Sequence, residues 1–157
     1  MRIVETVIDI NSKRKSRMAQ KIIEACGGVN GKTIAILGVT FKPNTDDMRD
    51  SPSLDIVADL QDAGATIRAY DPEGMEEAET MMVDVTWCAD AYETMSGANA
   101  VSIITEWNQF RALDLVRAKS LLKAPVMIDL RNIYDPKDMA KAGFTYVSVG
   151  RARVDGP

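Results

Sequence analysis

Residues 31–56, GKTIAILGVTFKPNTDDMRDSPSLDI, decide the fold of this chain. Within them, Thr33–Leu37 is a short apolar run, which is typical of a strand covered on both faces. A polar stretch, Gly38–Ser53, follows it. Ser51 then places a capping side chain before Pro52, which indicates the start of a helix. Strand, loop and helix in this order form the first unit of a parallel α/β sheet.

The same alternation continues along the chain. Further strands are expected at Thr66–Tyr70, Ala100–Ile104, Val126–Leu130 and Thr145–Val149, with a weaker candidate for an edge strand at Val83–Trp87. Helix starts are indicated at Asp71-Pro72 and Asp135-Pro136, and helix ends at Gly64 and Gly143. The sequence therefore predicts an α/β fold, a doubly wound, Rossmann-like parallel sheet with helices on both faces.

Residues 1–28 are expected to form a long linker helix ahead of this sheet. Gly27-Gly28 supply its stop, and its middle, Ser12–Arg17, is polar on every face. Its apolar residues recur at helical spacing: Val4, Val7, Ile8, Met18, Ile22 and Ala25. We therefore predict two parts, a connecting helix over residues 1–28 and a Rossmann-like binding domain over residues 29–157.

The composition excludes several classes of function. The formal net charge of -4 argues against nucleic acid as a partner, and the absence of histidine removes imidazole ligands and histidine bases. Cys26 and Cys88 form no CxxC pair, so neither a metal site nor a disulfide framework is expected. No apolar run approaches the ~20 residues that span a bilayer. We expect a cytoplasmic protein with no membrane partner.

The loop after Leu37 is the first candidate site, because ligands of an open parallel sheet bind beyond the carboxyl ends of its strands. It lacks the G-x-G-x-x-G spacing of a simple NAD-binding domain. A phosphate at this loop could meet Lys42, Arg49 and the positive end of the helix that starts at Ser51. The equally weighted alternative is that both cations only pair with the acids of the same loop, which are Asp46, Asp47 and Asp50.

Two more residues follow strands at the same edge. Arg131 comes after the strand APVMIDL, where its guanidinium suits a diphosphate, although Asp129 or Asp135 could hold it structurally. Asp71 follows the second strand, where dinucleotide-binding folds use an acid to hold ribose. Because Pro72 comes next, helix capping is the favoured role of Asp71.

Four segments together resemble one known family. Residues 31–56 are similar to the opening of the UDP-binding domain of the UDP-glucose and GDP-mannose dehydrogenases, and the similarity continues in YDPEGM, ITEWNQF and IDLRNIYD, over nearly the whole chain. Such enzymes oxidise the C6 alcohol of a nucleotide sugar to a carboxylate in two NAD-dependent steps, through a thioester on a cysteine. The resemblance implies that Phe41, Lys42 and Arg131 contact the nucleotide sugar, and that Arg49 reaches toward the NAD side of the cleft between domains.

The resemblance also implies what else the enzyme would need. The TFKPNTDDMR and TEWNQF segments fit the UDP-glucose branch better than dehydrogenases of GDP-mannose or UDP-N-acetylmannosamine. The Gly-rich NAD fingerprint and the segment with the nucleophilic cysteine have no counterpart in this sequence, and neither Cys26 nor Cys88 lies in a matching motif. We therefore expect no catalytic residue here, NAD bound mainly by a missing N-terminal domain, a homodimer in the full enzyme, and an inactive isolated chain.

Two alternatives come from other classes of protein. A signalling receiver domain is also doubly wound, but it needs a lysine after its fifth strand, where this sequence has Arg131-Asn132. A non-catalytic module that only binds nucleotide or mediates assembly describes the isolated chain if the chain is a fragment of the enzyme.

Overall fold

The computed structural model describes residues 17–156, and within them a single sheet runs in the order β3-β2-β1-β4-β5-β6. All five strand pairs are parallel. The strands are β1 Thr33–Leu37, β2 Thr66–Tyr70, β3 Val85–Trp87, β4 Ala100–Ile103, β5 Val126–Asp129 and β6 Thr145–Ser148. This is the strand order of dinucleotide-binding folds, and it separates the chain from a receiver domain, in which the first strand lies between the second and the third.

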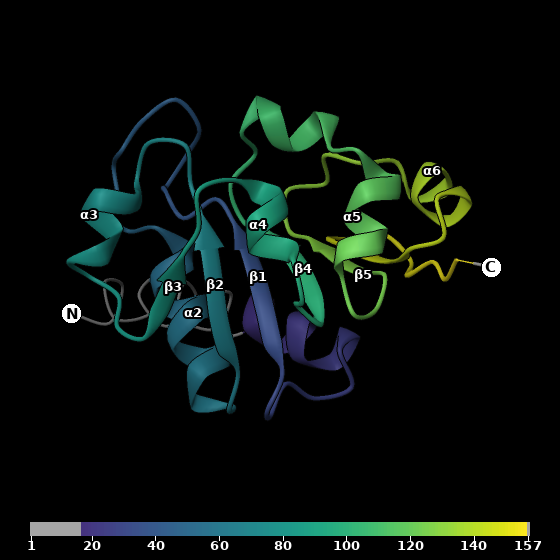
Figure 1. Cartoon of the computed structure of the whole chain (residues 1–157), viewed down its shortest axis with the longest axis horizontal. Coiled ribbons are helices and arrows are strands. Elements are labelled where there is room, and N and C mark those ends of the chain that lie inside the picture. Colours follow the sequence, from purple (N-terminus) through teal and green to yellow (C-terminus); the bar gives the residue numbers. More distant parts are fainter. Residues whose placement is uncertain (1–16, 157) are drawn as a thin grey trace, which may run out of the picture.

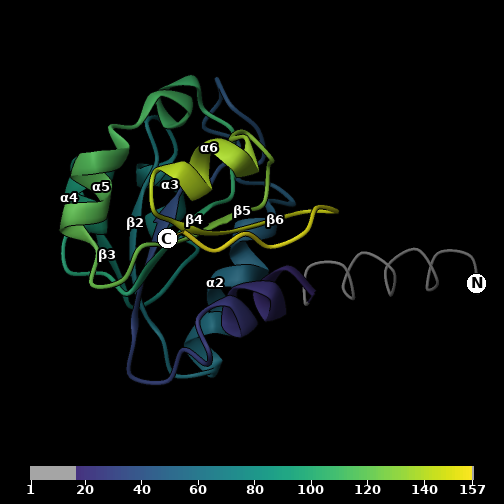
Figure 2. The same ribbon diagram turned by 90° about the vertical axis from the view of Figure 1, so that its right-hand side faces the viewer.

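Helices cover both faces of the sheet (Figures 1 and 2). They are α2 Pro52–Asp62, α3 Met75–Glu79, α4 Ala91–Met95, α5 Leu115–Leu121 and α6 Pro136–Lys141, with a 3-10 helix, η1, at Asn108–Ala112. In the edge view of Figure 2, α4 and α5 lie on one side of the sheet, and α2 lies on the other with the helix over residues 17–25. The predicted doubly wound α/β fold is confirmed.

Successive side chains of β1 point to opposite faces of the sheet, and both faces are covered, which explains why its sequence is apolar throughout. Ile34 and Ile36 lie in the core beneath α2, whereas Ala35 and Leu37 lie in the core beneath α4 and α5. All four side chains are fully buried. A strand that is covered on both faces needs apolar residues at odd and even positions alike, which is the pattern that predicted it.

The predicted strands are confirmed with small shifts at their ends. β1 and β2 have the predicted bounds, and β4, β5 and β6 each end one residue earlier. The weak candidate at Val83–Trp87 is an edge strand, β3, which begins at Val85.

The predicted helix starts are confirmed at two places and wrong at a third. Ser51 and Asp135 are the N-caps of α2 and α6, and each accepts a backbone hydrogen bond. Asp71 does not cap α3, which begins at Met75 after Gly74 and has no side-chain cap. Pro72 therefore lies in a turn before the helix, and Asp71 is free to point inward.

The helix over residues 17–25 packs on the sheet, since Ala19 and Ile22 are buried in the same core as α2. It ends at the predicted glycines, where the Gly28 N–H donates to Ile23 O at 2.9 Å and Gly27 has a φ of 65°. The predicted apolar face of Val4, Val7 and Ile8 lies outside the described residues. The domain boundary at residue 28 stays a prediction. No helix within residues 17–156 is long and apolar enough to cross a membrane.

Candidate functional site

The carboxyl ends of β1 and β4 form the crevice where the sheet changes direction. These strands are neighbours, but the chain leaves β1 toward α2 on one face and β4 toward α5 on the other. In such sheets this switch point is where ligands bind. Gly38 allows the two strand ends to meet: a Cβ at this residue would lie 2.6 Å from Thr105 Cβ, and its φ of +86° also disfavours a side chain.

Asp71 holds together the chain segments that form this crevice. Its buried carboxylate accepts hydrogen bonds from Val39 N at 2.8 Å, Thr40 N at 3.1 Å and Trp107 Nε1 at 3.2 Å. The same side chain also accepts from Thr40 Oγ1 and from the backbone N–H groups of Glu73 and Gly74. Neither expected role of Asp71 is observed, because both oxygens are occupied by the protein's own donors and none is left for a ribose.

The loop after β1 is held in one shape by short hydrogen bonds. Ser51 Oγ and Ser53 Oγ each donate to Val39 O at 2.5 Å, and Phe41 N donates to Asp47 O at 2.9 Å. The loop therefore folds back on itself and presents its tip to solvent. The Phe41 side chain, at 48% exposed, is unusually open for a large aromatic residue.

Lys42 lies beside Phe41 on this tip. It is exposed, and within residues 17–156 no carboxylate forms an ion pair with its ammonium group. A free cation at a strand end can accept an anionic ligand without first breaking an internal contact. Its charge still acts on the neighbouring acid at longer range, because Lys42 is one of the groups that lower the pKa of Asp47.

Arg49, in contrast, pairs with a neighbour in its own loop. Its Nε and Nη2 donate to the two carboxylate oxygens of Asp47 at 3.1 and 3.2 Å. These hydrogen bonds hold the pKa of Asp47 below its usual range. The Arg49 side chain is 88% exposed, so water screens the pair and a stronger partner could replace Asp47.

Arg131 lies in a tight turn after β5 that Asp129 organises. Asp129 Oδ1 accepts from Arg131 N at 3.0 Å, and Oδ2 accepts from Ile133 N at 2.8 Å. Tyr146 adds a hydroxyl hydrogen bond to Oδ2 at 2.6 Å. Asn132, with a φ of 55°, completes the turn.

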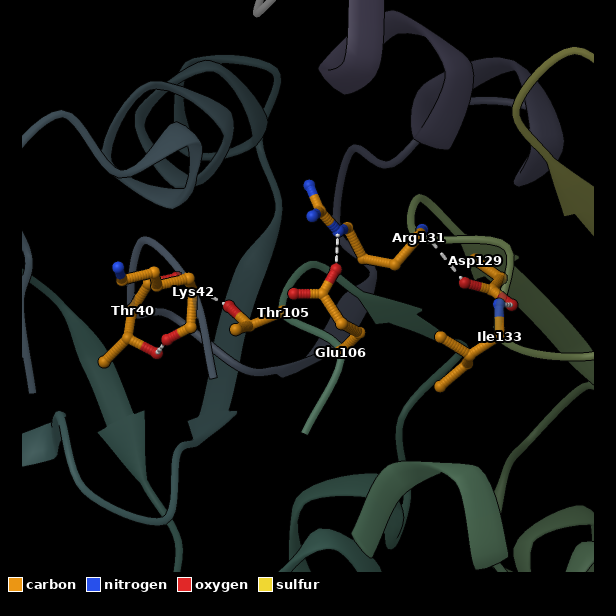
Figure 3. A network of polar contacts seen from close by, with 7 residues as sticks. All are labelled: Thr40, Lys42, Thr105, Glu106, Asp129, Arg131 and Ile133. Atoms are coloured by element: carbon orange, nitrogen blue, oxygen red, sulfur yellow. Dashed lines mark hydrogen bonds and ion pairs between the residues drawn. The ribbon is translucent and has the colours of Figure 1, made fainter. Parts of the chain in front are cut away.

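The side chain of Arg131 contacts a residue that the sequence did not single out. Its Nε donates to Oε2 of Glu106, and neither Asp129 nor Asp135 holds the guanidinium (Figure 3). Glu106 comes directly after Thr105 in the loop that follows β4, between the two predicted cations. The signal that could have identified Glu106 is its place in the loop directly after a buried strand, which is also what pointed to Lys42 and Arg131.

Lys42 and Arg131 thus lie at the same edge of the sheet, as predicted, with Thr105 and Glu106 between them (Figure 3). Neighbouring strands are about 4.8 Å apart, so β1 and β5, which flank β4, end about 10 Å apart. A nucleoside diphosphate or a nucleotide sugar is long enough to span these two strand ends.

Two hollows between the long loop and the α3 region are lined largely by acidic residues. One, of about 420 Å³, is lined by Thr45, Asp46, Asp47, Met48, Arg49, Glu77 and Met81. A second, of about 340 Å³, is lined by Asp46, Glu73, Glu76, Glu77 and Thr80. Their carboxylates would repel a diphosphate, so we place an anionic ligand at the rim with Lys42 and Arg131 instead. In the described part of the chain no group of His, Cys, Asp or Glu is arranged to hold a metal ion.

Comparison with known proteins agrees with the sequence motifs. Residues 35–136 match the model of the UDP-glucose/GDP-mannose dehydrogenase family, UDP binding domain. A UDP-glucose 6-dehydrogenase of Rhizobium meliloti is 53% identical over 96% of this chain, and the UDP-glucose 6-dehydrogenase TuaD of Bacillus subtilis is 40% identical over 99% of it. This chain covers 35% and 34% of those two proteins.

Solved structures give the same result. A UDP-glucose dehydrogenase of Pyrobaculum islandicum superposes on 97% of this chain with a TM-score of 0.78 and 30% identity. A UDP-D-ManNAc dehydrogenase of Pyrococcus horikoshii covers 87% of it, with a TM-score of 0.71 and 25% identity. The aligned part is 33% of the first protein and 31% of the second. The chain therefore belongs to the UDP-glucose/GDP-mannose dehydrogenase family and contains its UDP binding domain.

Proposed function

We propose that this chain supplies the nucleotide-sugar half of the active site of an NAD-dependent UDP-glucose 6-dehydrogenase, which converts UDP-glucose to UDP-glucuronate in two oxidation steps. The observation that carries the proposal is the pair of cations at one rim, Lys42 and Arg131, in a chain 53% identical to part of a UDP-glucose 6-dehydrogenase. Both cations stand where a diphosphate can meet them.

Each residue has a distinct part in binding. Lys42 offers an ammonium group that forms no ion pair with the described residues, and Arg131 offers a planar guanidinium that can donate two hydrogen bonds to phosphate. Phe41 is exposed enough for its ring to contact the base or the sugar. The reacting C6 carbon would then be held at a fixed distance from the cationic rim.

The NAD cofactor does not fit a site made by this chain alone. Gly38–Ser53 has no G-x-G-x-x-G spacing, and the acid that would hold a ribose, Asp71, is already saturated. We therefore propose that a second, NAD-binding domain is the partner of this one, with Arg49 the residue that contacts the cofactor from this side. The same resemblance leads us to propose a homodimer for the whole enzyme.

Nucleotide titrations of this chain test the proposal. Calorimetry with UDP, UDP-glucose, GDP and GDP-mannose is expected to give weak binding to the first two, in the range of about 0.1–1 mM for a half-site with two charge-assisted contacts. GDP and GDP-mannose should bind more weakly still. Tighter binding of GDP than of UDP would favour the alternative of a GDP-mannose dehydrogenase, and UDP-N-acetylmannosamine should be included as the second alternative substrate.

A further inference from the structure

Glu106 stands in the middle of the rim, between the two cations proposed to bind the diphosphate. It follows β4, the strand that separates β1 from β5. Its side chain is 20% exposed, and its carboxylate contacts Nε of Arg131. An acid at this point repels a diphosphate by itself, so its presence needs another reason.

The reason lies in which atoms of Arg131 contact Glu106. Glu106 engages Arg131 through Nε, and in residues 17–156 neither terminal nitrogen of this guanidinium has a hydrogen-bond partner. Figure 3 shows both terminal nitrogens pointing away from Glu106. These are two donors that a guanidinium offers to a phosphate.

Fold stability does not explain the pair. The Arg131 side chain is 39% exposed, and ion pairs at such positions add little to stability because water screens them. An arginine side chain without a partner samples many rotamers, however, and a ligand must then order it on binding. The ion pair with Glu106 orders the Arg131 side chain before the ligand binds, so that binding no longer has to.

We infer that Glu106 is a positioning residue of the nucleotide-sugar site, which holds the Arg131 guanidinium so that its terminal N–H groups face the diphosphate. The inference rests on the proposed function. The preceding residue acts on the other cationic loop, because Thr105 Oγ1 donates to Thr40 O at 2.7 Å, two residues before Lys42 (Figure 3). Two adjacent residues after β4 thus fix both cation-bearing loops.

A double-mutant cycle with UDP tests this role in the full 157-residue chain. Glu106→Ala should weaken UDP binding about three- to tenfold, the equivalent of ordering one long side chain on binding. Glu106→Gln keeps an oxygen that can accept from Nε, so it should bind within about twofold of the unchanged chain. In an Arg131→Ala background, Glu106→Ala should change the affinity by less than about twofold, because the residue that it positions is gone.

Three results of these titrations would overturn the inference. Tighter UDP binding in both Glu106 variants would mean that the carboxylate only repels the ligand. Equal weakening by Glu106→Ala with and without Arg131 would mean that Glu106 contacts the ligand itself. Unchanged affinity in Glu106→Ala, while Arg131→Ala still weakens binding, would remove Glu106 from the site and leave the proposed function intact.

A readout without ligand separates this inference from the proposed function. The Arg131 Nε–H signal in ¹⁵N NMR spectra should be protected from solvent exchange in the unchanged chain and in Glu106→Gln, and should broaden in Glu106→Ala. Asp155→Ala is the control, since it removes another carboxylate that pairs with an arginine, Arg153, at a more exposed position beside the start of β6 and away from the rim. If UDP does not bind to the unchanged chain, the proposed function fails; if the Nε–H signal is the same in all variants, the positioning role fails.

Discussion

Trp107 Nε1 donates a hydrogen bond to Asp71 Oδ2 at 3.2 Å, which ties the loop after β4 to the end of β2. Both side chains are buried, and the same carboxylate holds Val39 and Thr40 at the end of β1. Three strand ends of the candidate site are therefore fixed by one acid. Such a network is strong only while every member is satisfied.

Asp71→Ala is expected to be among the most destabilising substitutions in the chain. It leaves several buried donors unpaired, each at ~1–3 kcal/mol, so we expect a loss of about 3 kcal/mol or more. Trp107→Phe removes one donor and should cost about 1 kcal/mol. Urea unfolding followed by circular dichroism measures both. Asp138→Ala on the exposed face of α6 is the control, and a loss there as large as in Asp71→Ala would contradict the account.

Much of this arrangement could be predicted from local signals. Apolar runs predicted the strands, and Ser51-Pro52 and Asp135-Pro136 predicted two helix starts, because these features act within a few residues. The position of Lys42 and Arg131 at one edge follows from the parallel sheet, since all carboxyl ends of its strands point the same way. Local pattern was therefore enough to predict the fold and the sheet edge that carries the candidate site.

Contacts between distant segments could not be predicted in the same way. The Asp71 carboxylate turns inward because its donors come from residues 39, 40 and 107, which lie 31 to 36 positions away. Arg131 pairs with Glu106 across 25 positions rather than with the nearby Asp129 or Asp135. The Asp-Pro motif predicts that Asp71 caps the next helix. In the folded chain its carboxylate accepts hydrogen bonds from distant segments instead, and these outnumber the bonds that a cap would make.

Removal of either rim cation should weaken nucleotide binding. Because a charge-assisted contact contributes roughly 1.5–3 kcal/mol, Lys42→Ala and Arg131→Ala should each weaken UDP binding by about tenfold or more. Lys141→Ala and Arg153→Ala are the matched controls, since they remove the same charges from exposed positions near the start of β6, at the opposite edge of the sheet. Calorimetric titration of the five proteins checks this. Equal affinities throughout would show that the rim cations do not bind the ligand.

The chain alone should not reduce NAD in the presence of UDP-glucose. Cys88 is buried, and burial raises the pKa of the Cys26 thiol, so neither offers the reactive thiolate that thioester formation needs. NADH absorbance at 340 nm should stay at the level of a blank without protein, by the usual assay for such enzymes. Steady turnover that is lost in Cys26→Ala would identify Cys26 as a nucleophile and contradict this expectation.

Ser102 should tolerate an apolar replacement. Within the described residues its hydroxyl is the only buried side-chain polar atom without a hydrogen-bond partner. It lies on β4 opposite Ile36 and Ile128. Burying an unpaired hydroxyl costs free energy, so Ser102→Ala should leave stability unchanged or raise it by up to about 1 kcal/mol. A loss above about 1 kcal/mol in urea unfolding would reveal a partner for the hydroxyl.

Two tyrosines that hydrogen-bond within or against the turn that carries Arg131 resist ionisation, Tyr134 in the turn and Tyr146 on β6. Burial raises the pKa of Tyr134 to about 12, and burial together with the hydrogen bond to Asp129 raises the pKa of Tyr146 as well. Tyr134 OH donates to Phe110 O at 2.5 Å and accepts from Leu113 N at 3.2 Å. Both phenols are thus held neutral in the folded chain.

Stability should consequently fall at high pH. In the unfolded chain a tyrosine ionises near pH 10, so between about pH 10 and 12 the unfolded state binds fewer protons than the folded state. The stabilisation from the raised pKa is therefore complete below pH ~10 and is lost as the pH rises toward 12. Urea unfolding at pH 8, 10 and 11 should show this decline, and Tyr134→Phe should make it shallower. The same slope in Tyr134→Phe would exclude Tyr134 as a cause.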